Sequence, residues 1–260
     1  MIFIMQKIFS YRDLFWQLTF REIKARYKQS VLGYAWAILV PLLNLLVLSI
    51  VFSYIFRVPT GNIPYPIFLF VGLVPWLFLT LSITAATSSV MANSSLITKV
   101  KLPREILPIS AVSSKLIDLL LTTLVLTLFL IIYKIPFYPT LIFVPIIFFI
   151  QFVLILGISF WLSATNVFFR DVENILGIFL MIWMYLTPVL YPAELIPENL
   201  KFLFYLNPMT AIINSYRDSV LYGNIPDITS LLYASLFTIA LFIIGIIYFR
   251  RRARFFADVI

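Results

Sequence analysis

Residues 135–169, IPFYPTLIFVPIIFFIQFVLILGISFWLSATNVFF, contain no charged side chain. A helix needs about 20 mostly apolar residues to cross the hydrocarbon core of a bilayer. The stretch is long enough for one such helix, which we expect at residues 139–165. The rest of the chain is similar, because 62% of its 260 residues are hydrophobic and only 12% are charged, about half the usual share of a soluble domain. The sequence therefore predicts an integral membrane protein.

Runs with few or no charges recur on both sides of this stretch. Each is bounded by charged or turn-forming residues and is of spanning length. The further expected spans cover residues 34–56, 66–87, 113–133, 173–191 and 230–249. We therefore predict an all-α protein with six transmembrane helices, which form one transmembrane domain over residues 1–260.

The positive charges are distributed unequally between alternate loops. Fifteen Lys and Arg residues lie before the first span, between spans 2 and 3 or at the start of span 3, at the junction of spans 4 and 5, or after span 6. The opposite side has four, which are Arg57, Lys134, Lys201 and Arg217. Because Lys and Arg favour cytoplasmic loops, both termini are expected in the cytoplasm. The net charge of +8 then reflects membrane topology, not nucleic-acid binding.

Several kinds of chemistry lack their usual residues in this chain. The sequence contains no Cys and no His, which excludes disulfides, thiolate metal sites and a histidine general base. No glycine pattern for binding nucleotide phosphates occurs either. We predict a transport protein with no catalytic or metal site, which must obtain its energy from a partner.

The first 28 residues contain a segment that is too polar to span a membrane. Over residues 9–28 we predict an amphipathic helix in the cytoplasmic interface. Trp16, Phe20, Ile23 and Tyr27 fall within about 40° of the direction of Phe9 on a helix of 100° per residue. Its cations lie away from that stripe and are Arg21, Lys24, Arg26 and Lys28. The helix could be only an anchor, or its cations could also bind an anionic lipid headgroup.

Two charged segments are expected between spans on the cytoplasmic side. The first, KVKLPREILP (99–108), interrupts an apolar chain and offers a partner a place to bind, although the positive-inside bias alone would also explain it. Pro103 and Pro108 could delimit a short helical turn. The residues of interest are Lys99, Lys101, Pro103, Arg104 and Glu105. In the second, NVFFRDVEN (166–174), the charged residues are Arg170, Asp171 and Glu173, and Asp171 is expected to cap the following helix.

The region after span 5 and the deep aromatic residues each allow two interpretations. Residues 191–230 are either short helices that dip into the outer leaflet or a solvated loop. Aromatic rings within the spans either pack the core or offer apolar faces to sugars along a channel. The candidate channel residues are Trp76, Phe78, Trp161, Trp183, Tyr185 and Tyr191.

Five stretches together resemble the permease subunit of ABC type-2 polysaccharide exporters, most closely the O-antigen (Wzm-like) and teichoic acid exporters. They run in register from about residue 20 to the C-terminus. The stretches are REIKARYKQSVLGYAWAILVPLL (21–43), SSLITKVKLPREILP (94–108), NVFFRDVENILGIFLMIWMYLTPVLYP (166–192), LNPMTAIINSYRDSVLYG (206–223) and FRRRARFFADVI (249–260).

The resemblance implies a homodimer in the bacterial inner membrane, surrounded by membrane lipids. Two copies of a separate ABC ATPase subunit would bind ATP and Mg and drive export of an undecaprenyl-pyrophosphate-linked glycan. By the same resemblance, residues 94–106 hold a coupling helix, residues 9–28 lie near the lipid pyrophosphate, and residues 192–208 form periplasmic gate helices. A type-2 drug or lipid exporter is the alternative within transporters, and a passive channel or scaffold is the alternative outside them.

Overall fold

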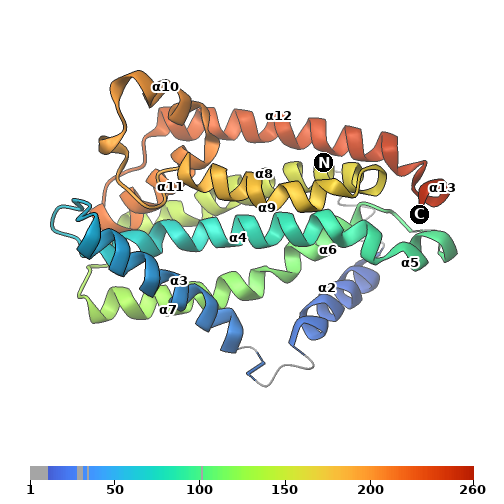
Figure 1. Ribbon diagram of the computed structural model, residues 1–260, viewed down its shortest axis with the longest axis horizontal. Coiled ribbons are helices and arrows are strands. Elements are labelled where there is room, and N and C mark those ends of the chain that lie inside the picture. Colours follow the sequence, from blue (N-terminus) through green and yellow to red (C-terminus); the bar gives the residue numbers. More distant parts are fainter. Residues whose placement is uncertain (1–10, 28–31, 34, 101) are drawn as a thin grey trace.

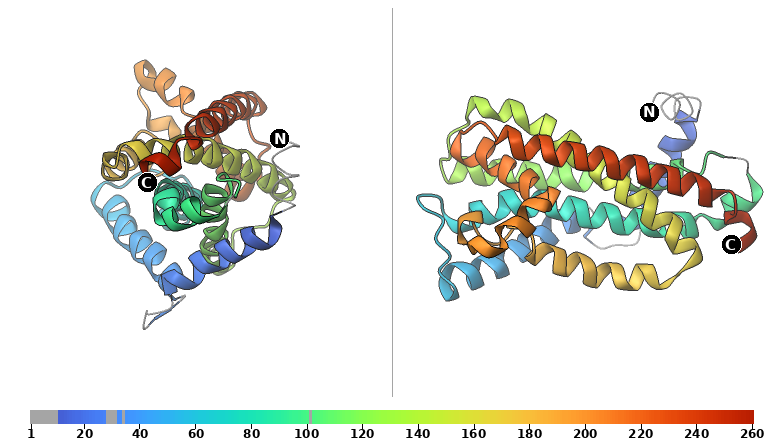
Figure 2. Two further views of the ribbon diagram at one scale, coloured as in Figure 1. Left: turned by 90° about the vertical axis from the view of Figure 1, so that its right-hand side faces the viewer. Right: turned by 90° about the horizontal axis from the view of Figure 1, so that it is seen from above.

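The computed structural model describes residues 11–27, 32–33, 35–100 and 102–260. This part of the chain consists of helices and connecting segments, with no strand. The long helices lie roughly along one axis, with α4 in the middle of the bundle (Figures 1 and 2). The all-α prediction is therefore confirmed for the described residues.

Five helical stretches among the described residues are long and apolar enough to cross a membrane. Two of them are single α-helices, and three combine an α-helix with a second helical segment. They are α3 (Ala35–Ile50) with the π-helical η1 (Val51–Ile55), α4 (Tyr65–Ala92), α6 (Ile106–Ser114) with α7 (Leu116–Ile132), η2 (Pro139–Phe143) with α8 (Val144–Phe168), and α12 (Ile228–Ala253).

The remaining helical segments lie before, between and after these stretches. They are shorter or more polar than the spanning candidates. These segments are α2 (Arg12–Tyr27), α5 (Ser94–Lys99), α9 (Asp171–Tyr185), η3 (Ala193–Leu195), α10 (Glu198–Leu206), α11 (Pro208–Arg217), η4 (Asp218–Tyr222) and α13 (Phe256–Val259).

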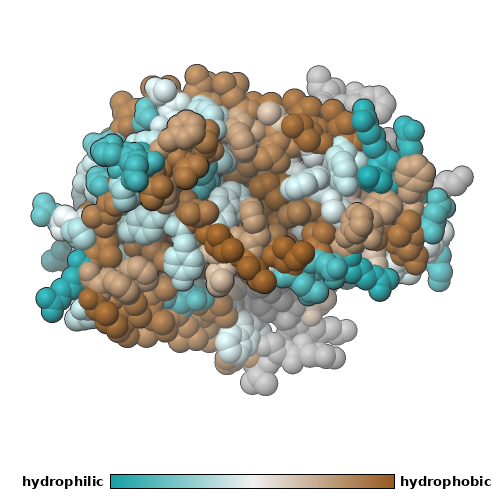
Figure 3. All heavy atoms as spheres, turned by 45° about the horizontal axis from the view of Figure 1, so that its top comes forward, coloured by the Kyte–Doolittle hydropathy of each residue, from teal (hydrophilic) through white to brown (hydrophobic). Residues whose placement is uncertain are grey.

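The central position of α4 follows from its composition. It is apolar on all sides, and 78% of its most hydrophobic window is buried, against 17–33% for the other four spanning candidates. A helix that is hydrophobic all round is stable when other helices surround it. It contacts α3, α6, α7, α8, α9 and α11. The outer helices keep apolar faces exposed, and Figure 3 shows apolar atoms over much of one face, with hydrophilic atoms mainly toward its two ends.

Helices α8 and α12 approach each other closely at two glycines. A Cβ atom added to Gly245 would lie 2.2 Å from the Gly157 carbonyl oxygen, and one added to Gly157 would lie 2.8 Å from Phe242 Cα. Small residues let helix backbones approach in this way. The two glycines therefore fix the spacing of the last spanning helix.

The sixth span, expected at residues 173–191, is not confirmed. Helix α9 ends at Tyr185, and its 15 residues extend about 22 Å, which is short for a bilayer. The helix ends because Pro188 has no amide hydrogen and disfavours helical geometry at Thr187. Residues 187–190 form a buried, non-helical continuation instead.

The third spanning helix starts earlier than expected, and this corrects the interpretation of Pro108. Helix α6 begins at Ile106 instead of residue 113, and Pro108 lies in its first turn, where proline is tolerated. The turn expected between Pro103 and Pro108 is therefore not a separate element: the Ile106 amide donates to the Pro103 carbonyl at 3.1 Å, and this turn continues into α6. Helix α5 ends at Lys99, and residues 100–105 connect it to α6. Residue 101 of this connection lies outside the described residues.

Candidate functional site

The helical bundle has two chemically different ends. We call "the basic end" the end formed by α2, α5, residues 102–105, the α8–α9 junction, the last turn of α12 and α13. We call "the distal end" the opposite one, formed by residues 56–64, residues 133–138 and the segment from Leu186 to Asp227 (Figure 1).

A hydrophobic cluster that is separate from the main core holds the short helices of the basic end. Its buried side chains come from seven helices that are far apart in sequence. They are Leu18 of α2, Val90 of α4, Ile97 of α5, Ile106 and Leu107 of α6, Phe160, Ala164 and Val167 of α8, Ile246 and Phe249 of α12, and Phe256 of α13. Ile97 of α5 therefore belongs to the same cluster as side chains of α2, α4 and α12.

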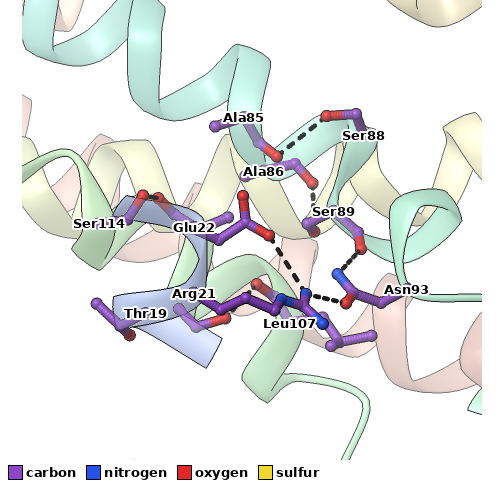
Figure 4. Close-up of polar contacts among 12 residues, drawn as sticks. Thr19, Arg21, Glu22, Ala85, Ala86, Ser88, Ser89, Asn93, Leu107 and Ser114 are labelled. Atoms are coloured by element: carbon purple, nitrogen blue, oxygen red, sulfur yellow. Dashed lines mark hydrogen bonds and ion pairs between the residues drawn. The ribbon is translucent and has the colours of Figure 1, made fainter. Parts of the chain in front are cut away.

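Helix α2 is also joined to α4 by polar contacts (Figure 4). The Arg21 guanidinium donates to Asn93 Oδ1, and its Nη2 lies 3.5 Å from Glu22 Oε1. Asn93 is buried where α4 gives way to α5, and its amide donates to the Ser89 carbonyl at 2.7 Å. An expected headgroup-binding residue, Arg21, thus contacts the residue that directly precedes the expected coupling segment at 94–106.

The face that α2 turns toward the bundle differs from the expected apolar stripe. Leu18, Thr19 and Ile23 are buried, whereas Trp16 and Phe20 are more than half exposed and stack at 5.7 Å between ring centroids. These two rings therefore face away from the bundle. Of the expected headgroup cations, Lys24 is exposed. Lys28 and the side chain of Arg26 lie outside the part of the chain that the structure describes, and so does Phe9 of the expected stripe.

The segment from Leu102 to Glu105 is tied to the C-terminal helices. Arg104 lies 5.8 Å from the centroid of the Phe256 ring, and Arg250 Nε donates to Glu105 Oε1 at 2.9 Å. Pro103 contributes its carbonyl, which accepts from the Ile106 amide at 3.1 Å. Lys99 is exposed at the end of α5, and Lys101 lies outside the described residues.

The cap expected at the second charged segment is not formed. Helix α9 begins at Asp171 itself, after Arg170, and no side-chain hydrogen bond caps it. Asp171 and Glu173 nevertheless lie exposed in the first turn, where their charges favour the helix through its dipole. Arg170 is also exposed.

The expected channel aromatics fall into two groups. Trp76 and Phe78 are buried in the main core, where Trp76 packs edge-on against Trp183 at 5.7 Å between centroids. Trp161 and Tyr185, in contrast, are 50% and 53% exposed. Tyr191 is half-buried, and its hydroxyl donates to the Tyr185 carbonyl at 2.6 Å. Trp76 and Phe78 are thus core-packing residues, whereas the exposed rings of Trp161 and Tyr185 remain accessible to a ligand.

Arg217 lies at the distal end with the other three cations of its expected side, but it differs from a loop cation. It lies at the end of α11 and is only 3% exposed. Its Nη1 and Nη2 donate to the Pro188 and Val189 carbonyls at 2.5 and 2.7 Å. Its guanidinium carbon lies 3.6 Å from the centroid of the Phe68 ring. Arg217 therefore holds the buried continuation of α9 against α4.

Other polar side chains hold the same non-helical segment. The Tyr65 hydroxyl donates to the Leu190 carbonyl at 2.7 Å, and the Asn207 amide donates to the Leu186 carbonyl at 3.1 Å. Trp183 Nε1 donates to Asn207 Oδ1 at 3.1 Å. The bonds to the Leu190 and Leu186 carbonyls satisfy backbone groups that Pro188 excludes from a helix, which is what a buried non-helical segment needs.

A sequence signal for this arrangement was present. Asn207-Pro208 is a helix start, because Asn is a good N-cap and Pro suits the first helical position. Asn207 indeed accepts from the Met209 amide at 3.1 Å. Ile212, Ile213 and Tyr216 then continue one helical face. This helix start therefore indicates that Arg217 lies within a helix and not in a loop.

The five long apolar helices of the described residues are those of a multi-pass membrane protein, and comparison with known proteins identifies its class. A family model described as ABC-2 type transporter matches residues 13–221, so the chain belongs to this family. The chain is 33% identical to the O-antigen export system permease protein RfbA of Myxococcus xanthus, over 99% of each chain. It is 34% identical to a protein of that name from Klebsiella pneumoniae, over 95% of each, and 27% identical to the polysialic acid transport protein KpsM of Escherichia coli, over 90% of this chain and 92% of the relative.

Proposed function

We propose that this chain is the permease subunit of an ATP-driven exporter that moves a polyprenyl-pyrophosphate-linked polysaccharide out of the cytoplasm. The observation that carries the proposal is the similarity over almost the whole chain to relatives named as O-antigen export permeases. Two copies of the chain would assemble with two separate ABC ATPase subunits, which bind ATP and Mg. The complex would lie in the bacterial inner membrane.

The distribution of charge supports a cytoplasmic basic end. Exposed cations at this end include Lys99, Arg170, Arg251 and Arg254, and such residues favour the cytoplasmic side. With this orientation, α9 and its continuation to residue 191 would form a short sixth span. Helix α10 and η3, within residues 192–208, would form the periplasmic gate.

The contacts of the basic end support a route for coupling. An ATPase that pushes on the segment from α5 to Glu105 would move α12 through the bond between Glu105 and Arg250. The same push would reach α2 through Asn93 and Arg21. Helix α2 would lie beside the lipid pyrophosphate, which the positive charges of Arg21, Lys24, Arg26 and Lys28 would attract.

The exporter function is tested by reconstituting the permease with its ATPase in vesicles. We expect lipid-linked glycan to cross the membrane only with ATP. Movement of glycan without the ATPase would instead indicate a passive channel. Movement of drugs or simple lipids without glycan would indicate the alternative kind of type-2 exporter.

The coupling role is tested by reversing the charges of Lys99, Lys101 and Arg104 to Glu. We expect weaker assembly with the ATPase, or hydrolysis that no longer supports export. The matched control places the same reversals on three cations of the distal end, Arg57, Lys134 and Lys201, and should leave assembly unchanged. Export and hydrolysis equal to wild type in the Lys99, Lys101 and Arg104 variant would contradict the coupling role.

The two groups of aromatic residues separate a channel role from a packing role. Trp161→Ala or Tyr185→Ala should lower the export rate without lowering assembly, because both side chains are exposed. Trp76→Ala should lower the melting temperature, because large-to-small changes in a core cost roughly 3–5 kcal/mol. Normal export by both exposed-site variants would remove them from the channel.

A further inference from the structure

Phe256 of the short helix α13 lies where three separate elements of the basic end meet. Its side chain is 0% exposed, and its ring packs edge-on against that of Phe249 in α12, at 5.5 Å between centroids. The Phe168 ring, at the end of α8, lies 6.2 Å away, and the Arg104 guanidinium carbon lies 5.8 Å from the Phe256 centroid. Helix α13 also contacts α5 (Figure 1). One buried ring therefore joins α12, the end of α8 and the segment at 102–105.

Two of these elements are not held in place by helical structure of their own. Residues 102–105 are non-helical, and α5, which precedes this connection, has only six residues. An isolated helix of that length is not stable in water. The α8–α9 junction is likewise non-helical at Phe169 and Arg170. Each segment therefore depends on side-chain contacts for a fixed position.

The last turn of α12 adds weaker contacts to the same two segments. Arg250 Nε donates to Glu105 Oε1 at 2.9 Å. The Arg252 guanidinium carbon lies 5.2 Å from the centroid of the Phe168 ring. Both arginines are exposed, and ion pairs and cation–ring contacts at exposed positions contribute little. The buried ring of Phe256 is therefore the main connection between the two segments.

The two segments lie at the same end of the bundle, where the proposed function places the ATPase. Lys99 is exposed just before the first segment, and Arg170 is exposed within the second. Close-packed side chains pass a displacement on to their neighbours, because they leave no space to absorb it. A packed ring between the two segments would therefore make a push on one of them reach the other.

We propose that Phe256 is a positioning residue for energy coupling. By filling the space between Arg104, Phe168 and Phe249, its ring makes the segment at 102–105 and the α8–α9 junction move as one unit when the ATPase acts on them. The proposal rests on the proposed function, because that function supplies the ATPase. Phe256 acts through these neighbours and not on the nucleotide or the glycan.

The first measurement is amide hydrogen exchange of the full-length permease in lipid nanodiscs, without the ATPase, followed by mass spectrometry. Each segment has a reporter amide, since Ile106 donates to the Pro103 carbonyl at 3.1 Å and Val172 donates to the Phe169 carbonyl at 3.2 Å. In Phe256→Ala a cavity replaces the ring. We therefore expect both reporter amides to exchange roughly tenfold faster than in wild type.

The second measurement is the amount of glycan exported per ATP hydrolysed by the full complex in vesicles. Phe256→Ala should still assemble with the ATPase, but this ratio should fall roughly three- to tenfold. A role in folding alone would lower the amount of complex and not the export per ATP. Phe256→Leu keeps most of the buried apolar volume and should restore both the ratio and the slow exchange.

The preceding residue offers a matched control. Phe255 carries the same side chain but is 54% exposed, so Phe255→Ala should leave the exchange of both reporter amides and the export per ATP at their wild-type values. Phe256→Val leaves a smaller cavity than Phe256→Ala. It should speed exchange in both segments to a lesser extent, and it serves as the test variant if Phe256→Ala does not fold.

Two results would overturn the proposal. One is that loss of the Phe256 ring speeds exchange in only one of the two segments, or in neither, which would show that the ring does not join them. The other is faster exchange in both segments with wild-type export per ATP, which would show that the connection is not used for coupling. The proposed function fails separately, if the wild-type complex moves no glycan with ATP, because the exchange measurement needs neither ATPase nor glycan.

Discussion

At the basic end, charged side chains lie near the surface and pair with one another, whereas at the distal end Arg217 is enclosed by protein and bonds to backbone. Arg250 and Glu105 form an ion pair at 2.9 Å in which the Arg250 side chain is 42% exposed. Arg217 donates to the carbonyls of Pro188 and Val189, and its guanidinium lies over the Phe68 ring. Cations are thus accessible to a partner at the basic end, whereas at the distal end a cation holds non-helical backbone.

The largest effect should come from breaking the buried arrangement. Arg217→Met keeps most of the side-chain volume but leaves the Pro188 and Val189 carbonyls unpaired. Hydrogen bonds to charged groups are worth about 1.5–3 kcal/mol each, so we expect a loss of roughly 3–5 kcal/mol. Thermal unfolding in detergent would show it as a clearly lower melting temperature.

The matched change at the basic end is Glu105→Gln. It removes the charge that pairs with Arg250 on a partly exposed surface, where such pairs are worth about 0–1 kcal/mol. We expect a melting temperature close to that of wild type. Equal losses for Glu105→Gln and Arg217→Met would contradict the proposed difference between the two ends.

A moderate effect is expected where α2 meets α4. Arg21→Gln weakens the contact with Asn93, so α2 should open more often and its amides over residues 12–27 should exchange roughly five times faster, as a loss of about 1 kcal/mol implies. Lys24→Gln changes a second, exposed cation of the same helix and should leave the exchange rate unchanged. Equal exchange in the two variants, measured by mass spectrometry, would show that Arg21 does not hold the helix.

The comparison also explains which parts of the fold follow from sequence. Runs with few or no charges predict where the five spanning candidates lie, because a charged side chain is costly within a bilayer and spanning helices can therefore be located from hydropathy. The same rule fails at Arg217, since it treats every cation as exposed. It also misses the early start of α6, because Pro108 is compatible with a first helical turn, and the early end of α9, because Pro188 lies within an apolar run.

The candidate sites followed from sequence only in part. The segment near Lys99 and Arg104 could be located because its charges interrupt an apolar chain. Its connections could not, because Glu105 and Arg250 are far apart in sequence and meet only after α6 and α12 pack on α8. The contacts of Phe256 were missed for the same reason, since they come from three elements that meet only in the folded chain.

The smallest effect concerns Asp218, the carboxyl beside Arg217. Its pKa is raised to about 6 by burial first and then by the charges of Glu194 and Asp227, and Arg217 opposes this shift. In an unfolded chain the pKa is near 4, so between about pH 4 and 6 the folded protein binds more protons and its stability falls as the pH rises. Asp227 has a lowered pKa, caused mainly by its bond with Ser230, and its opposite contribution lies at lower pH. The melting temperature of wild type, compared with that of Asp218→Asn, should therefore decrease from pH 5 to pH 7. If the two proteins respond equally to pH, Asp218 is solvated in the folded protein, and the distal end would not bury its carboxylate as it buries Arg217.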